Sequence, residues 1–254
     1  MATADPTLRF SSRVENYIRY RPGYPSQVIE TLKTECGLTQ DSIVADIACG
    51  TGIFTRMLLD NGHRVIGVEP NRDMREAAER LLASYPNFTS VTGTAEATNL
   101  AVRSVDFATA AQAAHWFDLP KARAEFARIL KPGGWAVLLW NERCTDTTPF
   151  LRDYENLLLH YGTDYEKVRH ENTTDNIGDF FAQTPYESRV FDMSQQFAYP
   201  DLEGRLLSSS YAPMPGHPDH DPMLQELRRI FEDYNKDSRV SMDYLTRLYF
   251  GQVT

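Results

Sequence analysis

The sequence predicts an α/β fold: a doubly wound, mostly parallel sheet of seven strands, with helices on both faces and a C-terminal extension. Two observations lead to this fold class. Between residues 25 and 142, apolar segments of strand length alternate with segments of helical periodicity, as in successive βαβ units. The strand-length segments are short and mostly apolar, which is typical of parallel strands covered on both faces.

The elements of this region follow one another at short intervals. The predicted strands are 42–48, 64–68, 88–92, 105–111 and 135–140. The predicted helices are one that follows Ser26 and stops at Gly37, then 53–59, 72–84 and 119–130. Asn71 and Asp118 have side chains suited to capping the last two of these helices. The residues Lys131-Pro132-Gly133-Gly134 predict a turn before the last strand.

The last hundred residues have a different pattern. Helices are predicted at 149–161, 201–211 and 222–234, and extended segments at 188–199 and 239–249. No second glycine-rich nucleotide site occurs there, so we interpret this part as a lid and two added strands at one sheet edge. The expected organisation is an N-terminal helical cap at 1–40, a ligand-binding core at 41–142, and lid helices with completing strands at 143–254.

Composition and charge limit the partners. The 254 residues include 26 basic and 35 acidic ones, a net charge of −9, which argues against nucleic acid and anionic membranes as partners. Three cysteines without paired spacing fit a reducing compartment. No apolar run is long enough to span a bilayer, and Asp5 and Pro6 do not fit a signal peptide. We therefore expect a cytoplasmic protein without a nucleic-acid or membrane partner. We further expect it to be a monomer or homodimer.

The strongest local feature is a glycine-bearing turn after the first strand. Gly50 and Gly52 allow the backbone to turn sharply and to approach a ligand at the start of the next helix. Glu69 ends the second strand 19 positions after Gly50, close to the spacing of about 20 for an acid that binds ribose hydroxyls. A turn and an acid so placed predict a nucleoside-binding site.

Two residues bear on which nucleoside is bound. A dinucleotide site has a third glycine where this chain has Thr55, and it holds a pyrophosphate. Asp46, just before the turn, would repel a pyrophosphate but suits a ligand with positive charge, such as a sulfonium with an α-amino group. A nicotinamide-dependent oxidoreductase and a non-catalytic binding protein remain as alternatives.

Four motifs in register now give a resemblance to a known family. They are Asp46-x-x-x-Gly50-x-Gly52, Glu69-Pro70, Gly93-Thr94-Ala95-Glu96, and Ile129-Leu130-Lys131-Pro132-Gly133-Gly134. Over about residues 40–142 the chain resembles the class I S-adenosylmethionine-dependent methyltransferases, which have a Rossmann-like fold, and within them the small-molecule, type 11-like members. The resemblance implies S-adenosylmethionine as the cofactor and identifies 41–142 as the core that binds it.

Three further segments resemble one branch of that family, the trans-aconitate-methyltransferase-like proteins. They are Phe10-Ser11 with Tyr17 and Tyr20-Arg21-Pro22-Gly23-Tyr24-Pro25, then Ala111-Gln112-Ala113-Ala114-His115-Trp116-Phe117, and more loosely Tyr249-Phe250-Gly251. This branch acts on a carboxylate, so the resemblance favours O-methylation of a small carboxylic acid.

The resemblance also implies roles for individual residues. The implied cofactor-binding residues are Asp46, Ala48, Gly50, Thr51, Gly52, Glu69, Pro70, Met74, Ala95, Glu96 and Gln112. Of these, Asp46 and the turn would hold the methionine portion, Glu69 the ribose, and Ala95 with Glu96 the adenine edge. Thr94 stands where many members have an aspartate, which leaves open which side chain binds the adenine amino group.

Residues that follow the fourth and fifth strands are candidates for chemistry, because α/β sites form at the carboxyl edge of the sheet. His115 is the candidate general base, and the alternative is that it caps or packs against the neighbouring loop with no proton transfer. Arg21, Trp116, Asn141 and Arg143 are the candidate substrate-binding residues. Residues 217–221 have metal-ligand side chains but no supporting strand, so we predict no metal site.

Overall fold

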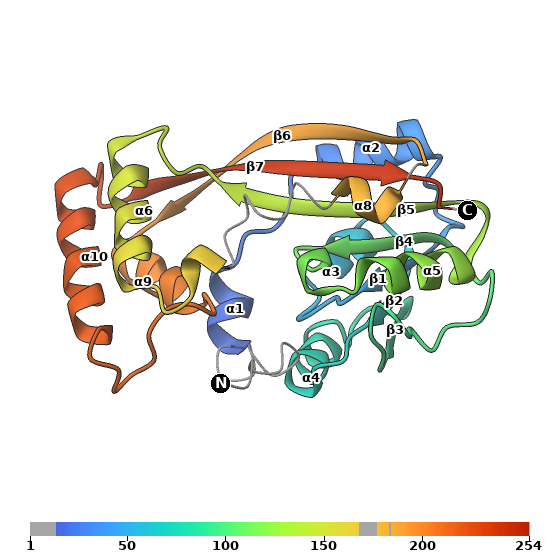
Figure 1. Cartoon of the computed structure of the whole chain (residues 1–254), viewed down its shortest axis with the longest axis horizontal. Helices are drawn as coiled ribbons and strands as arrows, with labels where there is room; N and C mark the ends of the chain where they lie inside the picture. Colours follow the sequence, from blue (N-terminus) through green and yellow to red (C-terminus); the bar gives the residue numbers. More distant parts are fainter. Residues whose placement is uncertain (1–13, 168–176, 183, 254) are drawn as a thin grey trace.

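The protein forms one seven-stranded sheet with helices on both faces, in the order β3-β2-β1-β4-β5-β7-β6. This computed structural model describes residues 14–167, 177–182 and 184–253 (Figure 1). Phe10 and Ser11 of the branch-specific opening, and parts of the predicted cap and lid, lie outside these residues. The predicted fold class, a Rossmann-like and mostly parallel sheet, is confirmed.

The strands follow the predicted segments closely. Their bounds are β1 Ile43–Ile47, β2 Arg64–Val68, β3 Phe88–Val91, β4 Val105–Ala111, β5 Leu130–Arg143, β6 Tyr186–Phe197 and β7 Val240–Gly251. The first five pair in parallel, while β7 pairs antiparallel with both β5 and β6. The two C-terminal strands therefore extend one sheet edge, as predicted.

The main helices also match, with small shifts at their ends. Their bounds are α1 Val14–Tyr20, α2 Gln27–Cys36, α3 Ile53–Asp60, α4 Arg72–Leu81, α5 Leu119–Ile129, α6 Pro149–Tyr161, α8 Ile177–Phe181, α9 Tyr199–Leu207 and α10 His220–Tyr234, with short 3₁₀ turns η3 Ala114–Trp116 and η4 Tyr165–Lys167. Asn71 and Asp118 cap α4 and α5 as predicted, each accepting a hydrogen bond from a first-turn amide.

The prediction of a plain turn at 131–134 needs correction. Leu130 pairs with Val105 and Trp135 pairs with Phe107, so residues 131–134 lie opposite Asp106 alone and bulge out within β5. Gly133 has a φ of 78°, which glycine adopts without strain. The Lys131 ammonium lies 2.9 Å from the Asp106 carboxylate and holds the bulge against β4.

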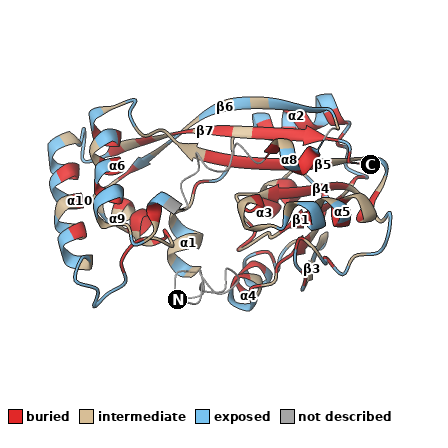
Figure 2. Cartoon of the chain, in the orientation of Figure 1, coloured by how far each residue is buried: buried red, intermediate tan, exposed pale blue. Residues whose placement is uncertain are grey.

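Alternation along the strands separates two hydrophobic cores. On β5, Ala136, Leu138 and Trp140 face α5 and α8, whereas Val137 and Leu139 face α2, α3 and α4. This alternation places one helical layer on each face of the sheet, and the buried strands between them appear red in Figure 2. The carboxyl ends of the parallel strands are thereby fixed at one edge.

A third hydrophobic core lies beyond the parallel strands. The long strands β5, β7 and β6 extend beyond the other strands of the sheet toward α6, α9 and α10 (Figure 1). Apolar side chains of these three helices pack on the far ends of β6 and β7, and α1 packs against α9. The C-terminal segment thus faces the carboxyl edge of the parallel strands across α1.

The described residues lack two features. None of the helices in the described ranges has both the length and the apolar character that crossing a bilayer requires. No group of three or more His, Cys, Asp or Glu side chains there is arranged to hold a metal ion.

Candidate functional site

A cavity of about 280 Å³ opens at the carboxyl edge of β1, β2, β3 and β4. The predicted cofactor residues that line it are Ala48, Gly50, Glu69, Pro70, Met74, Ala95, Glu96 and Gln112. His115, Trp116 and Arg21 line it as well. These segments are far apart in sequence but meet here, because parallel strands bring their carboxyl ends to one edge of a sheet.

The turn after β1 has a left-handed backbone at three alternate residues. Ala48, Gly50 and Gly52 have φ values of 55°, 58° and 87°. A Cβ atom on Gly52 would lie 2.7 Å from Cδ1 of Leu82, whereas one on Gly50 would meet nothing within 4 Å. Gly52 is therefore needed for packing against α4, and Gly50 keeps the wall of the cavity open.

Gln112, directly after the neighbouring strand β4, has the same strained backbone, with φ 57°. A non-glycine residue in this region carries about 1–3 kcal/mol of strain, and such residues cluster at functional sites. Ala48 and Gln112 follow adjacent strands at the point where the strand order reverses. The strain therefore coincides with the edge where doubly wound sheets bind ligands.

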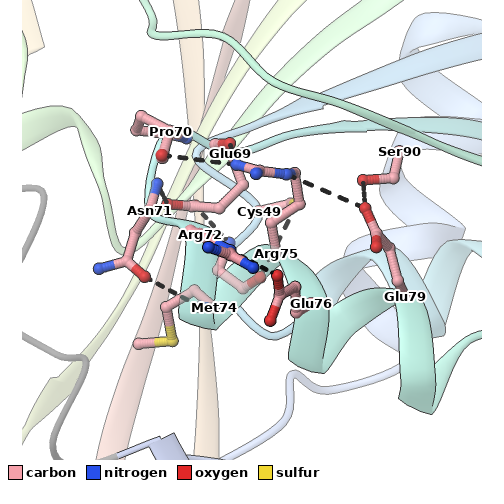
Figure 3. Close-up of polar contacts among 11 residues, drawn as sticks. Cys49, Glu69, Pro70, Asn71, Arg72, Met74, Arg75, Glu76, Glu79 and Ser90 are labelled. Carbon is pink, nitrogen blue, oxygen red and sulfur yellow. Dashed lines mark hydrogen bonds and ion pairs between the residues drawn. The ribbon is translucent and has the colours of Figure 1, made fainter.

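Glu69 links the turn to the next helix. One of its carboxylate oxygens accepts a hydrogen bond from the Gly50 amide and the other from the Asn71 amide, each at 2.8 Å. Figure 3 shows Glu69 among its neighbours, with Arg75 donating to the Glu69 carbonyl. Burial raises the pKa of the Glu69 carboxyl, and the two amide hydrogen bonds oppose that rise. The carboxylate keeps lone pairs for ligand hydroxyls, because each oxygen accepts more than one hydrogen bond.

Asp46 lies beneath the turn and does not line the cavity. Its carboxylate is fully buried and accepts hydrogen bonds from the hydroxyls of Thr55 at 2.6 Å and Thr109 at 3.0 Å. Burial raises the pKa of Asp46 to about 6, although both hydrogen bonds oppose the rise. At neutral pH the group is thus mostly ionised. Its negative charge lies under the turn, and Thr55, at the position of a dinucleotide site's third glycine, holds it there.

The far end of the cavity has apolar and polar walls. Pro70 and Met74 lie on one side, and Ala95 and Glu96 on another. One oxygen of Glu96 accepts a hydrogen bond from the Asp118 amide at 2.9 Å, so this side chain also holds the start of α5.

A second cavity, of about 510 Å³, adjoins the first. Six residues line both cavities: Tyr17, Arg21, Tyr24, Ile53, Gln112 and Tyr211. The Gln112 amide nitrogen donates to the Asn141 carbonyl at 3.1 Å, while its buried Oε1 has no hydrogen-bond partner among the described residues. Gln112 therefore presents an unused acceptor where the two cavities meet.

Three predicted substrate residues, Arg21, Asn141 and Arg143, line the second cavity, and all three make hydrogen bonds to the protein. Asn141 donates to the Gly23 carbonyl at 2.8 Å and accepts from Thr246 at 2.6 Å. Arg143 forms an ion pair with Glu155 and donates to the Tyr165 hydroxyl at 3.0 Å. These contacts tie the N-terminal segment and α6 to the strands, which is an architectural role.

His115 and Trp116 line the first cavity and not the second. Their rings lie 4.5 Å apart within η3. The second cavity also contains Arg205, which sequence reasoning missed. One arginine in an amphipathic helix carries no signal that distinguishes it from a surface residue, and only the packing of α9 reveals its burial.

The sheet order, the glycine turn and the acid that ends β2 are typical of α/β proteins with a nucleoside site, and comparison with known proteins agrees with this class. Residues 45–138 match the methyltransferase domain family. Residues 45–138 thus form a methyltransferase domain, and its relatives and solved structures support assignment to the class I S-adenosylmethionine-dependent methyltransferases.

Relatives extend the match. An uncharacterised methyltransferase of Mycobacterium tuberculosis is 39% identical over 139 residues, which are 55% of this chain and 54% of that protein. An uncharacterised methyltransferase of Schizosaccharomyces pombe is 28% identical over 206 residues, 79% of this chain and 77% of that protein. The chain matches about half the length of its mycobacterial relatives.

Solved structures show the same fold over nearly the whole chain. A candidate type II methyltransferase from Anaeromyxobacter dehalogenans has a TM-score of 0.69 and 21% identity, covering 92% of this chain and 98% of that one. A candidate methyltransferase from an antibiotic biosynthesis pathway of Anabaena variabilis has a TM-score of 0.65 at 21% identity, with the same coverage. The C-terminal strands and helices therefore belong to this architecture.

Proposed function

We propose that the protein transfers a methyl group from S-adenosylmethionine to a small-molecule acceptor. The observation that carries this proposal is the pair of adjoining cavities, with Glu69 in the first and Gln112 where the two meet. A cavity with a ribose-type acid suits the cofactor, and the neighbouring one suits an acceptor. The resemblance to trans-aconitate-methyltransferase-like proteins stays a prediction, and the methyltransferase relatives do not favour the oxidoreductase alternative.

The residues present fit this cofactor. Glu69 would bind the ribose hydroxyls, Pro70 and Met74 would pack beside the adenine, and the open space at Gly50 admits the ligand against the turn. The ionised Asp46 beneath the turn favours a cationic ligand, and the unpartnered Gln112 Oε1 suits an ammonium donor. When bound, S-adenosylmethionine supplies a methyl group already activated by its sulfonium.

The protein's contribution is then mainly positioning. Aligning two reactants and excluding water can account for about 7–11 kcal/mol of a barrier. Tyr17, Tyr24 and Tyr211 surround the junction of the cavities and would exclude water from it. We extend the proposal to the organisation of the chain, in which the described parts of 1–40 and 143–254 cover the core at 41–142. The packing of α1 on α9 above these cavities supports it.

We propose a carboxylate as the acceptor group. A carboxylate is ionised at neutral pH and needs no base. The positive charge of Arg21, which lines both cavities, favours an acceptor that is anionic overall. With a net charge of −9, a nucleic-acid acceptor is disfavoured. We keep a monomer or homodimer as the assembly.

On this proposal, His115→Ala should lower turnover by only about tenfold, through lost positioning. The pH–rate profiles of wild type and variant should have the same shape near pH 6.5, the usual histidine pKa of about 6.5. The reason is that no proton has to be removed from a carboxylate acceptor. The measurement is transfer of labelled methyl from S-adenosylmethionine to panels of small carboxylic acids, phenols, amines and thiols, followed by pH profiles of the best acceptor.

Trp116→Phe is the control, since it alters the same wall of the cavity without a titrating group. Abolished turnover in His115→Ala, with loss of a wild-type basic limb near that pH, would contradict the carboxylate proposal. It would identify His115 as a base that acts on a hydroxyl, amine or carbon acid.

A further inference from the structure

Four arginines line the second cavity, and two of them have carboxylate partners. Arg247 lies 2.5 Å from Glu142, and Arg143 is paired with Glu155. The remaining two are Arg21 and Arg205. Neither has a carboxylate within ion-pair distance in the described ranges, although both are largely enclosed by protein.

The protein satisfies Arg205 only with neutral groups. Arg205 is only 6% exposed. Its guanidinium donates from Nε to the Tyr244 hydroxyl at 3.3 Å and from Nη1 to the Ser209 hydroxyl at 3.2 Å. Arg21 donates from Nη2 to the Ser208 carbonyl at 3.1 Å, and its buried Nε has no hydrogen-bond partner among the described residues. A buried charge without an opposite charge is unfavourable, so a compensating group is expected.

Helix packing brings these two like charges together. A Cβ atom on Gly204 would lie 2.0 Å from the ring of Tyr20, so only glycine allows α1 to approach α9 this closely. Arg21 follows Tyr20, and Arg205 follows Gly204, so this close approach brings both arginines to the second cavity, near enough for their charges to interact. Burial lowers the pKa of Arg21, and the positive charge of Arg205 lowers it further.

We propose that Arg205 and Arg21 form an anion-binding subsite that holds a non-reacting oxyanion of the methyl acceptor. The inference rests on the proposed function for the identity of the ligand as acceptor, but the subsite itself is testable without methyl transfer. The ligand chemistry is a planar or tetrahedral oxyanion, a carboxylate or a phosphate monoester, because guanidinium groups bind both through paired hydrogen bonds. Tyr17 and Tyr211 also line this cavity, and a tyrosine hydroxyl is a group that can donate to an oxyanion.

The held oxyanion is not the methylated group. An oxyanion gripped by two guanidinium groups has its lone pairs engaged in charge-assisted hydrogen bonds and is a weak nucleophile. The second cavity also extends to Gln112, which borders the first cavity. The acceptor therefore has at least two functional groups: an oxyanion at Arg205 and Arg21, and a separate nucleophile near Gln112.

The test uses the full chain saturated with S-adenosylhomocysteine and measures binding of succinate, glycerol 3-phosphate and neutral succinamide by calorimetry. We expect the two anions to bind, and succinamide not to bind. Arg205→Met should weaken anion binding by about tenfold or more, and Arg205→Lys, which keeps the charge, by less. Preference for succinate or for the phosphate ester would identify the oxyanion as a carboxylate or a phosphate.

Arg247→Met is the matched control, because it removes one positive charge from the same cavity, but from an arginine that already has a carboxylate partner. It should change anion affinity by less than about threefold. Equal binding of succinate, glycerol 3-phosphate and succinamide, or equal losses in Arg205→Met and Arg247→Met, would overturn the subsite. If Arg205→Met does not fold, the losses of anion affinity in Arg205→Lys and Arg247→Lys are compared instead. A larger loss in Arg205→Lys supports the subsite, and equal losses overturn it. Failure to bind S-adenosylhomocysteine at all would instead overturn the proposed function, so the two failures are distinct.

Discussion

Replacing Glu69 with alanine is expected to weaken S-adenosylhomocysteine binding by about 1.5–3 kcal/mol, or roughly 10- to 150-fold. The carboxylate would no longer be available to the ribose, and the amides of Gly50 and Asn71 would lose their acceptor. Calorimetric titration of wild type and variant measures the effect. Glu69→Gln should fall between the two, because it keeps one acceptor oxygen.

Glu76→Ala provides the control for this prediction. Glu76 is on α4, as part of the same region, but accepts from Arg72 at 2.6 Å on the exposed side of the helix (Figure 3). Its removal should leave cofactor affinity unchanged. Unchanged affinity in Glu69→Ala itself would contradict our placement of the ribose.

The second large effect concerns the two glycines of the turn, which we expect to differ in kind. Gly52→Ala should destabilise the protein by about 2–4 kcal/mol, because the new methyl group would overlap the Leu82 side chain in a left-handed backbone. Gly50→Ala has a similar backbone but no steric contact, so its loss of stability should be only about 1 kcal/mol. Urea unfolding curves measure both values.

For cofactor affinity we expect the reverse order, with the larger relative loss in Gly50→Ala. The methyl group of Gly50→Ala would project into open space in the wall of the first cavity, so this variant should lose affinity for S-adenosylhomocysteine more than stability. Equal loss of stability in both variants would show that strain in the backbone, and not contact with Leu82, makes glycine necessary at position 52.

Local sequence signals predicted most of the parallel core. Strand β2 and helix α6 have the predicted bounds, because apolar runs and capping residues determine short elements locally. The helix predicted at 201–211 instead spans Tyr199–Leu207, since Pro200 occupies its first turn, where a missing amide is tolerated. The helix predicted at 222–234 begins two residues earlier, at His220, and the one predicted at 72–84 ends at Leu81.

Residues of the candidate site could be predicted only where the type and spacing of a residue imply what it contacts. The spacing between Gly50 of the turn and Glu69 is visible in the sequence alone. Both residues line the first cavity and are joined by a hydrogen bond. Asn141 and Arg143 occupy the expected edge, but whether a side chain there faces a ligand or a protein partner depends on α6 and the N-terminal segment. Arg205 depends on how α9 meets α1, a long-range packing that no local pattern encodes.

Thermal unfolding with and without ligand tests the central claim most directly. A ligand that binds only the folded state, at about 100 times its Kd, stabilises by about 2.7 kcal/mol, which corresponds to roughly 5–10 °C in Tm for a domain of this size. We expect S-adenosylhomocysteine and S-adenosylmethionine to raise the Tm by this amount, and NAD to leave it unchanged. An equal or larger rise with NAD, or no rise with S-adenosylhomocysteine, would contradict the assignment of the first cavity to the methyl donor.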